Sequence, residues 1–143
     1  MAVQPKIARY ILDDQVGFVL RQVSQRHAAI FIGKIGEDLT PTQWAVLAKL
    51  LEKGPSSQNL LGRQTAMDAA TIKGVVDRLT KRGLTQTHPD PDDARRLVVV
   101  LTHEGKRLAQ EAVPRAEAIT EDTLAPLSRA ERMTLLNLLR KLI

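Results

Sequence analysis

Two adjacent arginines, Arg95 and Arg96, separate a run of prolines and aspartates from an unbroken β-branched series in the stretch HPDPDDARRLVVVLT, residues 88–102. Guanidinium groups on an exposed turn can reach phosphates, or enter a narrow minor groove of DNA where the negative potential is enhanced. Asp92 and Asp93 would repel DNA if they were free, so one of them should pair with an arginine and fix its direction. The expected pair is Asp93 with Arg95. The alternative is a solvated charged turn without a ligand.

A second group of candidate contacts lies on one face of the helix that the sequence predicts over residues 68–83. Apolar residues spaced three and four apart form one stripe, so the small and basic residues between them face outward. A helix that enters the major groove needs short side chains where its backbone approaches the bases. Gly74, in mid-helix, costs about 1 kcal/mol relative to alanine and therefore calls for such a reason. The alternative is an ordinary solvated basic face. The candidate DNA-contacting residues are Ser57, Ala70, Thr71, Lys73, Gly74, Arg78, Asp93, Arg95 and Arg96.

Three helices are predicted ahead of this one. In residues 13–36, apolar residues spaced three and four apart follow Asp13 and Asp14, which could cap an amphipathic helix. Residues 39–55 carry a capping box and end at a Gly-Pro pair, and both features mark helix borders. A short helix over 57–65 follows, and its proximity to the helix 68–83 indicates a tight helix-turn-helix.

After Gly83 the sequence no longer shows the spacing of apolar residues that is typical of a helix. Residues 84–88 and 95–102 read as two strands that flank the tip 89–94, which makes a β-ribbon with a protruding loop. Pro114 should kink or interrupt the helix predicted over 103–124, and we expect a bent helix. A last helix, 128–143, carries more apolar residues than one face needs.

This order predicts a mainly α fold with a small β-ribbon, a winged helix-turn-helix with extra helices at both ends. At 143 residues the chain should form a single domain, residues 1–143. A net charge of +5 favours polyanionic partners without proving one. No apolar run could span a bilayer and no signal peptide is evident, so we expect a cytoplasmic protein that does not bind membranes.

Several chemistries are excluded or disfavoured. The chain has no cysteine, which removes disulfides, thiolate metal sites, cysteine nucleophiles and thiol-based redox sensing. Its three histidines are far apart and lack the carboxylate spacing of a metal site. No phosphate loop, nucleophile elbow or paired-carboxylate arrangement is present. We therefore expect no enzyme, no cofactor and no metal.

Three stretches, LTPTQWAVLAKL, RLTKRGL and DPDDARRLVVVLTHEG, resemble the MarR family of bacterial transcriptional regulators over nearly the whole chain. The most specific signature of that family is an Asp-x-Arg in the wing followed by Leu-Thr-x-x-Gly. Here it falls on Asp93, Arg95, Leu101, Thr102 and Gly105. Family members more often carry arginine where this chain has Ala94, which leaves open whether Arg95 or Arg96 enters the minor groove. We expect Arg95.

The resemblance implies a homodimer built from residues 1–36 and 103–143, with residues 40–102 as the DNA-binding lobe. Such a dimer would bury the surplus apolar residues of 7–14 and 133–143. It would act as a repressor that leaves a pseudo-palindromic operator when a small molecule binds. The alternative is a winged-helix module that docks on protein and binds no specific DNA.

The effector is expected to be a non-covalent small molecule, an aromatic carboxylate or a phenol. Trp44 and His27 could supply a flat apolar wall and a ring donor, with Arg21 as a carboxylate partner. Each has a structural alternative: His27 lies on the apolar stripe of its helix, where a buried, hydrogen-bonded role is expected, and Trp44 would be a core residue.

Overall fold

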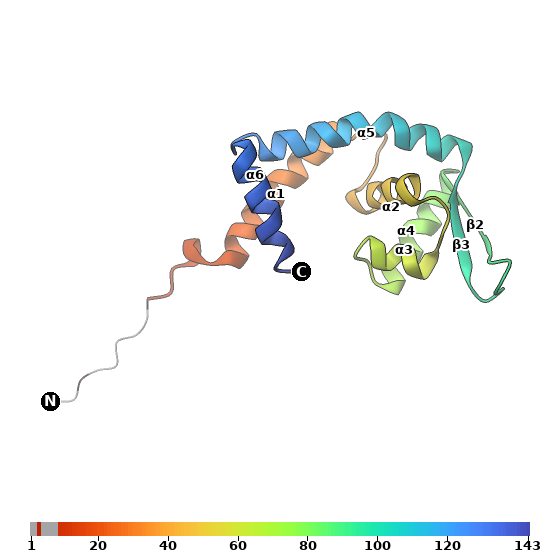
Figure 1. Ribbon diagram of the computed structural model, residues 1–143, viewed down its shortest axis with the longest axis horizontal. Coiled ribbons are helices and arrows are strands. Elements are labelled where there is room, and N and C mark those ends of the chain that lie inside the picture. The colour runs from red at the N-terminus through yellow and green to blue at the C-terminus, as the bar shows by residue number, and fades with distance from the viewer. Residues whose placement is uncertain (1–2, 4–8) are drawn as a thin grey trace.

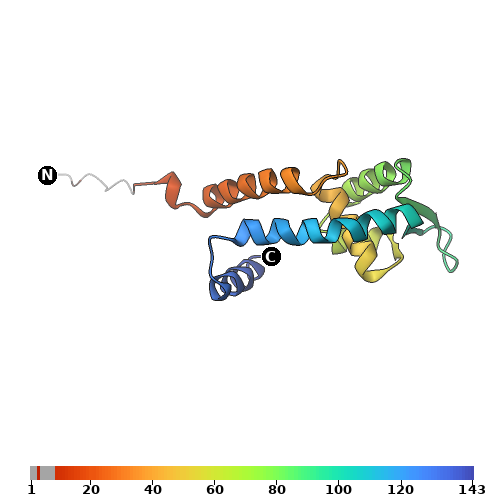
Figure 2. The ribbon, with the colours of Figure 1, turned by 90° about the horizontal axis from the view of Figure 1, so that it is seen from above.

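The structure has two parts: a helical arm made of α1 (Val16–Lys34), α5 (His103–Leu124) and α6 (Arg129–Arg140), and a lobe made of α2 (Pro41–Lys53), α3 (Gln58–Gln64), α4 (Ala69–Lys81) and a small sheet, which lies at one end of the arm (Figure 1). The computed structural model describes residue 3 and residues 9–143. The longest helix, α5, crosses the molecule, with α1 and α6 near one end and the lobe near its other end (Figure 1). From above, α1 and α5 run side by side (Figure 2).

The predicted helix starts are confirmed, with one exception. Side chains of Thr40, Ser57, Asp68, Thr102 and Ser128 each accept a bond from a backbone N–H in the first turn of their helix. Capping of the first long helix by its two aspartates was wrong. Those residues belong to a 3-10 turn, η1 (Leu12–Asp14), and α1 starts after Gln15 without a side-chain cap.

The sheet has three strands, where the sequence indicated two. The wing strands β2 (Thr85–Pro89) and β3 (Leu97–Leu101) pair antiparallel, with Thr87 opposite Val99. A two-residue strand, β1 (Ser56–Ser57), pairs with the other edge of β3, so that the strand order is β1-β3-β2. Two serines beside a proline give no strand pattern, and only the pairing with β3 makes them a strand.

One core holds the lobe together and extends under α5. Apolar residues from every major helix of the lobe, from β3 and from α5 are almost wholly buried; they include Val46, Leu47, Leu61, Ile72, Val75, Leu79, Val99 and Ala112. Phe31, Ile35 and Ile119 continue the core into the start of the arm. The lobe is therefore packed on α5, while the outer face of α4 and the far half of the arm remain exposed.

Pro114 does not interrupt α5, which is helical from His103 to Leu124. Proline removes only one bond, the one from its own nitrogen to the carbonyl of Gln110, and Gln110 is exposed so that water can satisfy this carbonyl. Apolar contacts by Ala109, Ala112 and Ile119 on both sides of the proline hold the helix in place. The helix is bowed rather than broken (Figure 1).

Candidate nucleic-acid interface and effector groove

The outer face of α4 has the small, basic character expected from the sequence. Asp68 caps the helix by accepting the Thr71 N–H at 2.7 Å, and hydrogen bonding to the Thr71 side chain and to its backbone N–H lowers the pKa of the Asp68 carboxyl. The apolar stripe Ile72, Val75, Val76 and Leu79 is buried, whereas Ala70, Thr71, Lys73, Asp77, Arg78 and Lys81 are exposed. The hydrophobic stripe thus turns the basic side chains away from the lobe.

Gly74 makes room for a side chain of its own helix. A Cβ at this position would lie 3.4 Å from both terminal nitrogens of Arg78, whose guanidinium therefore lies across the glycine. Lys73 is occupied by an ion pair with Asp77 at 2.8 Å one turn along the helix. On the exposed face of α4, Lys73 is thus held by an ion pair, and the Arg78 guanidinium lies over Gly74.

The tip of the wing is an ordered turn built around Asp93. The Arg95 Nε atom donates to Asp93 Oδ1 at 3.1 Å, and the Arg95 backbone N–H donates to the same oxygen at 3.1 Å. Nη2 of Arg95 also donates to Asp93 Oδ2 at 3.4 Å. The hydrogen bonds from the Arg95 side chain and, to a smaller extent, the bond from its backbone N–H lower the pKa of the Asp93 carboxyl. The predicted Asp93–Arg95 pair is confirmed. Arg95 keeps 93% of its side chain exposed, so the aspartate directs it without covering it.

Backbone bonds close the rest of the tip. The Arg96 N–H donates to the Asp93 carbonyl at 2.9 Å, and the Asp90 N–H donates to the Arg96 carbonyl at 2.8 Å. The side chain of Asp90 accepts the Asp92 N–H at 2.8 Å. Asp92 thus takes part in the turn through its backbone, while Arg96 projects an exposed side chain beside Arg95.

The wing and α4 meet at the first residue of α3, a position that sequence reasoning missed. Gln58 and Leu97 line two adjoining hollows. One, of about 220 Å³, is shared with Asn59, Arg95 and Arg96, and the other, of about 540 Å³, reaches Lys73 and Lys81 on α4. Ser57, in contrast, is half-buried and its hydroxyl accepts the Leu60 N–H at 3.2 Å. Gln58 and Asn59 were overlooked because they follow a cap residue and carry no charge.

The Leu-Thr-x-x-Gly stretch joins the wing to α5. The Thr102 hydroxyl donates to the Gly83 carbonyl at 2.6 Å and accepts the Gly105 N–H at 3.0 Å, while the Thr102 N–H donates to the Leu84 carbonyl at 3.1 Å. A Cβ at Gly105 would overlap the Leu84 carbonyl oxygen. Only glycine lets α5 approach the start of β2 this closely.

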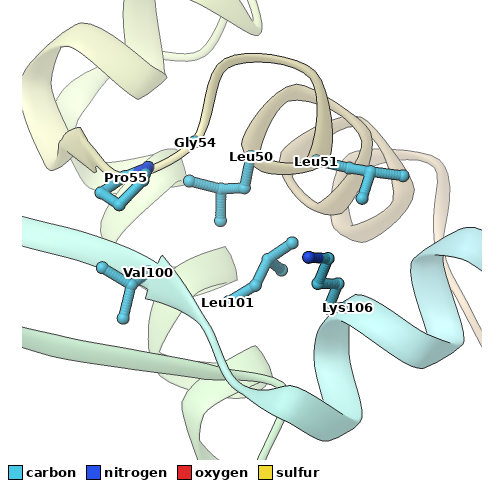
Figure 3. A pocket seen from close by; sticks show the side chains of 7 residues that line it. All are labelled: Leu50, Leu51, Gly54, Pro55, Val100, Leu101 and Lys106. Atoms are coloured by element: carbon cyan, nitrogen blue, oxygen red, sulfur yellow. The ribbon is translucent and has the colours of Figure 1, made fainter.

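A hollow beside this junction separates α2 from the end of β3 (Figure 3). It measures about 240 Å³ and is lined by Leu50, Leu51, Gly54, Pro55, Val100, Leu101 and Lys106. The amine of Lys106 points across its mouth, and the other side chains are apolar (Figure 3). The hollow therefore lies between the end of the wing strand and the C-terminal end of α2.

An apolar groove of about 510 Å³ opens in the arm between α1, α5 and α6. Its polar end holds His27, whose Nδ1 lies 2.8 Å from the Thr123 hydroxyl, and Arg26, which donates to the carbonyls of Thr123 and Asp122 at 2.7 and 2.9 Å. The remaining walls are mostly aliphatic: Val23, Thr120, Leu124, Pro126, Leu127, Leu135, Leu136 and Leu139. The groove could hold a single-ring ligand with one polar edge.

The three candidate effector residues do not come together here. His27 lines the groove, and it is exposed rather than buried, so the expected buried role is wrong while the expected hydrogen bond is present. Trp44 is half-buried against the core of the lobe, as a core residue would be. Arg21 is exposed on α1. Neither Trp44 nor Arg21 lines the groove.

The link between α1 and α2 has an unusual backbone. Gly36, Glu37 and Asp38 all have positive φ, at 70°, 56° and 53°. A left-handed residue with a side chain costs about 1 to 2 kcal/mol, so surrounding contacts must hold this link in place. Arg115 of α5 lies against it, since a Cβ at Gly36 would lie 3.6 Å from its Cζ. Nε and Nη2 of Arg115 are buried without a hydrogen-bond partner in the structure.

Two features are absent from the described part of the chain. No group of three or more His, Cys, Asp or Glu side chains in residue 3 and residues 9–143 could hold a metal ion. Within the same residues, no helix is long and apolar enough to cross a membrane.

Comparisons with known proteins agree with this geometry. The sequence model of the MarR family matches residues 39–97, from the start of α2 to the wing. The HTH-type transcriptional repressor NicR of Pseudomonas putida is 44% identical over 135 residues, which cover 94% of this chain and 85% of NicR.

Two solved structures resemble the whole fold. A "probable transcriptional regulator" of Pseudomonas aeruginosa is 57% identical, with a TM-score of 0.91 over 93% of this chain and 100% of the other. BpsR of Bordetella bronchiseptica, whose DNA binding is regulated by 6-hydroxynicotinic acid, is 42% identical, with a TM-score of 0.90 over 94% and 97% of the two chains. The winged helix, the Asp93–Arg95 wing and these relatives lead to one conclusion: the chain belongs to the MarR family of transcriptional regulators.

Proposed function

We propose that this protein is a dimeric repressor that binds a pseudo-palindromic operator and leaves it when a small aromatic acid or phenol binds. The observation that carries the proposal is the juxtaposition around Gln58 of the exposed face of α4 and the arginines held by Asp93. Residues 40–102 form the DNA-binding lobe, and residues 1–36 and 103–143 form the dimerisation arm. Residues 1–2 and 4–8 of that arm lie outside the described part of the chain.

On DNA, α4 enters the major groove and the wing follows the backbone beside it. Ala70 and Thr71 at the start of α4 approach the base edges, and Lys73 and Arg78 donate to phosphates or bases. Arg95 enters the neighbouring minor groove, with Arg96 on the phosphates. Gln58 and Asn59 join these contacts because they lie between the two basic surfaces.

Dimerisation covers an apolar surface that a single chain leaves open. On α1, Val16, Val19, Leu20 and Val23 are each more than two-fifths exposed, and at the C-terminal end Met133, Leu138 and Leu142 are more than half exposed. Contiguous apolar surface of this kind is rare on monomers and typical of subunit interfaces. A two-fold dimer of the arms places the two α4 helices in successive major grooves, about 34 Å apart.

The effector binds in the arm groove, next to His27. The walls are aliphatic and the polar end carries an imidazole and a hydroxyl, which suits an aromatic ring with one acidic or phenolic substituent. BpsR supports this class, because its DNA binding is regulated by a hydroxylated pyridine carboxylic acid. A ligand that changes the spacing of the two lobes weakens both half-sites together.

The proposal assigns no catalytic step to the chain, in keeping with its regulator relatives. A repressor of bacterial genes works where the DNA is, and we therefore place the protein in the cytoplasm.

The test begins with duplexes selected by the protein from a random pool. Fluorescence anisotropy should give a steep salt dependence, with several counterions released per dimer. Binding that is weak or insensitive to salt favours a protein-docking module instead. The complex is then titrated with 6-hydroxynicotinic acid, benzoate and phenol, and separately with hydrogen peroxide at doses that leave methionine unoxidised. Release by peroxide alone contradicts a non-covalent effector.

A further inference from the structure

Arg82, the residue that ends α4, turns away from the DNA-facing surface. Its Nη2 donates to the Glu37 carbonyl at 2.6 Å, and its Nη1 lies 3.4 Å from the Asp38 carbonyl. Both acceptors belong to the link between α1 and α2, more than forty residues away in sequence. A basic residue at the end of a recognition helix would otherwise be taken for a phosphate contact, but here the guanidinium is already bound to protein.

The acceptors are aligned by the left-handed backbone of the link. Glu37 and Asp38 have φ values of 56° and 53°, and this conformation turns their carbonyls toward one guanidinium. The planar guanidinium presents its donors in a fixed fork, which matches two neighbouring carbonyls as an ammonium cannot. The arrangement therefore depends on arginine rather than on positive charge alone.

The same guanidinium reaches the first turn of α2. Nη1 of Arg82 lies 3.3 Å from Oε1 of Gln43, the side chain whose oxygen also accepts the Thr40 N–H in the capping box. Gln43 is buried, with 7% of its surface exposed. Arg82 thus connects three parts at one point: the end of the recognition helix, the start of α2 and the link to the arm.

We propose that Arg82 is a positioning residue that sets the orientation of α4 relative to the dimerisation arm, and so determines which half-site spacing the dimer accepts. This inference rests on the dimeric operator binding proposed above. In a two-fold dimer, a rotation of each lobe about the link changes the separation of the two recognition helices. The fork to Glu37 and Asp38 resists that rotation.

The experiment measures spacing discrimination. Duplexes carry two copies of the selected half-site at the preferred spacing, or with one base pair added or removed between them. Anisotropy titrations compare wild type, Arg82→Lys, Arg82→Gln and the charge control Lys81→Gln, which removes the neighbouring exposed cation. A duplex with one half-site reports whether each lobe still folds and reads DNA, and thermal melting reports global stability.

The discrimination is the ratio of the affinities for the preferred and the altered spacing. We expect this ratio to fall about tenfold or more in both Arg82 variants, while half-site affinity and the salt slope stay unchanged. Lys81→Gln should keep the discrimination. Arg82→Lys with the discrimination of wild type would overturn the proposal, because a simple charge would then suffice. A salt slope lowered by about one in Arg82→Gln, with equal losses on every duplex, would also overturn it, since that is how a phosphate contact behaves.

Two further variants keep the outcome clear. Glu37→Asn removes the carboxylate but tolerates positive φ, so it should keep the discrimination if the carbonyl is the acceptor. One glycine inserted after Asp38 displaces the acceptors while Arg82 stays in place, and it should relax discrimination even if the Arg82 variants fail to fold. An unchanged preference after this insertion counts against the proposal. If the wild-type protein itself shows no preference among the spacings, that result contradicts the dimeric operator binding proposed above. It does not bear on the contacts of Arg82.

Discussion

Asp93 holds Arg95 by three hydrogen bonds: the side-chain Nε and the backbone N–H each donate to Oδ1 at 3.1 Å, and Nη2 donates to Oδ2 at 3.4 Å. An acidic residue on a surface that faces DNA should weaken binding by its charge. If its main effect is to direct Arg95, Asp93→Ala lowers operator affinity, although it removes a negative charge. The fall should be smaller than that caused by loss of Arg95. Anisotropy at fixed salt measures it, with Asp92→Ala as the control, and tighter binding by Asp93→Ala would show that repulsion is the larger effect.

The same pair has a predictable pH dependence. The pKa of Asp93 is lowered by the bonds from Arg95, so the carboxylate persists to lower pH than a free aspartate. The contribution of the pair is therefore complete above the ordinary pKa and is lost only as pH falls through the lowered value. The affinity ratio of wild type to Asp93→Ala should stay constant from pH 8 to pH 5. A ratio that changes over this range contradicts the assignment.

Arg95→Ala should lower operator affinity by about 1 to 3 kcal/mol while the dimer stays intact, because it removes a charged groove contact and no core packing. A gel-shift titration at moderate salt measures the loss, and sedimentation checks the dimer. Arg96→Ala is the matched comparison and should lower affinity less. Equal losses for both would place the two arginines in equivalent phosphate contacts, and no loss for Arg95→Ala would exclude the wing from the interface.

Deleting the chain from Ser128 onward should abolish the dimer and, with it, tight operator binding, since α6 and the residues after it carry much of the exposed apolar surface. Analytical ultracentrifugation measures the assembly. Leu138→Asp offers a milder variant, because this side chain is 54% exposed in the single chain and its loss removes no core contact. A truncated protein that sediments as a dimer and binds normally contradicts the proposed interface.

Gly105→Ala should destabilise the fold by about 1 to 3 kcal/mol or more, because the new Cβ overlaps the carbonyl of Leu84, which accepts the Thr102 N–H just before β2. Gly33→Ala is the control: nothing lies within 4 Å of its Cβ position in the helix, so the chain should gain up to about 1 kcal/mol. Urea unfolding of both variants tests the difference. A neutral Gly105→Ala would mean that α5 can withdraw from the wing junction.

Arg115→Met should raise the free energy of unfolding by about 1 kcal/mol or more, since it removes two buried nitrogens that lack partners. Arg132→Met is the opposite control, because Arg132 donates to the Leu127 carbonyl and to Glu121. Chemical denaturation compares them. A destabilised Arg115→Met would contradict this, because it would mean that the guanidinium makes a favourable interaction in the folded protein.

Local signals in the sequence predicted most of the fold. Helix caps such as Thr40 and Ser128 bond to a residue three positions further along the chain, so they can be predicted from the sequence. The Asp93–Arg95 pair is local for the same reason. Contacts between segments that are distant in the sequence have no local sequence signal. The pairing of Ser56 with Val99 and the contact of Arg82 with Glu37 depend on how the lobe closes.

The effector residues show the same limit. His27, Arg21 and Trp44 were grouped by chemical type, and only packing decides that His27 lies over the α5 terminus while Trp44 faces the lobe core. The capping prediction for Asp13 and Asp14 failed because an aspartate before an apolar run fits a 3-10 turn as well as a helix start.

The short strand β1 has a kinetic consequence for the search along DNA. Because Ser57 both pairs with β3 and caps α3, the base of the wing is tied to the helix-turn-helix in the free protein. The conformational entropy of ordering the wing is therefore lost during folding, and little of it remains to be lost at the operator. Association should then be governed by diffusion and orientation, with a rate constant that does not depend on a slow rearrangement.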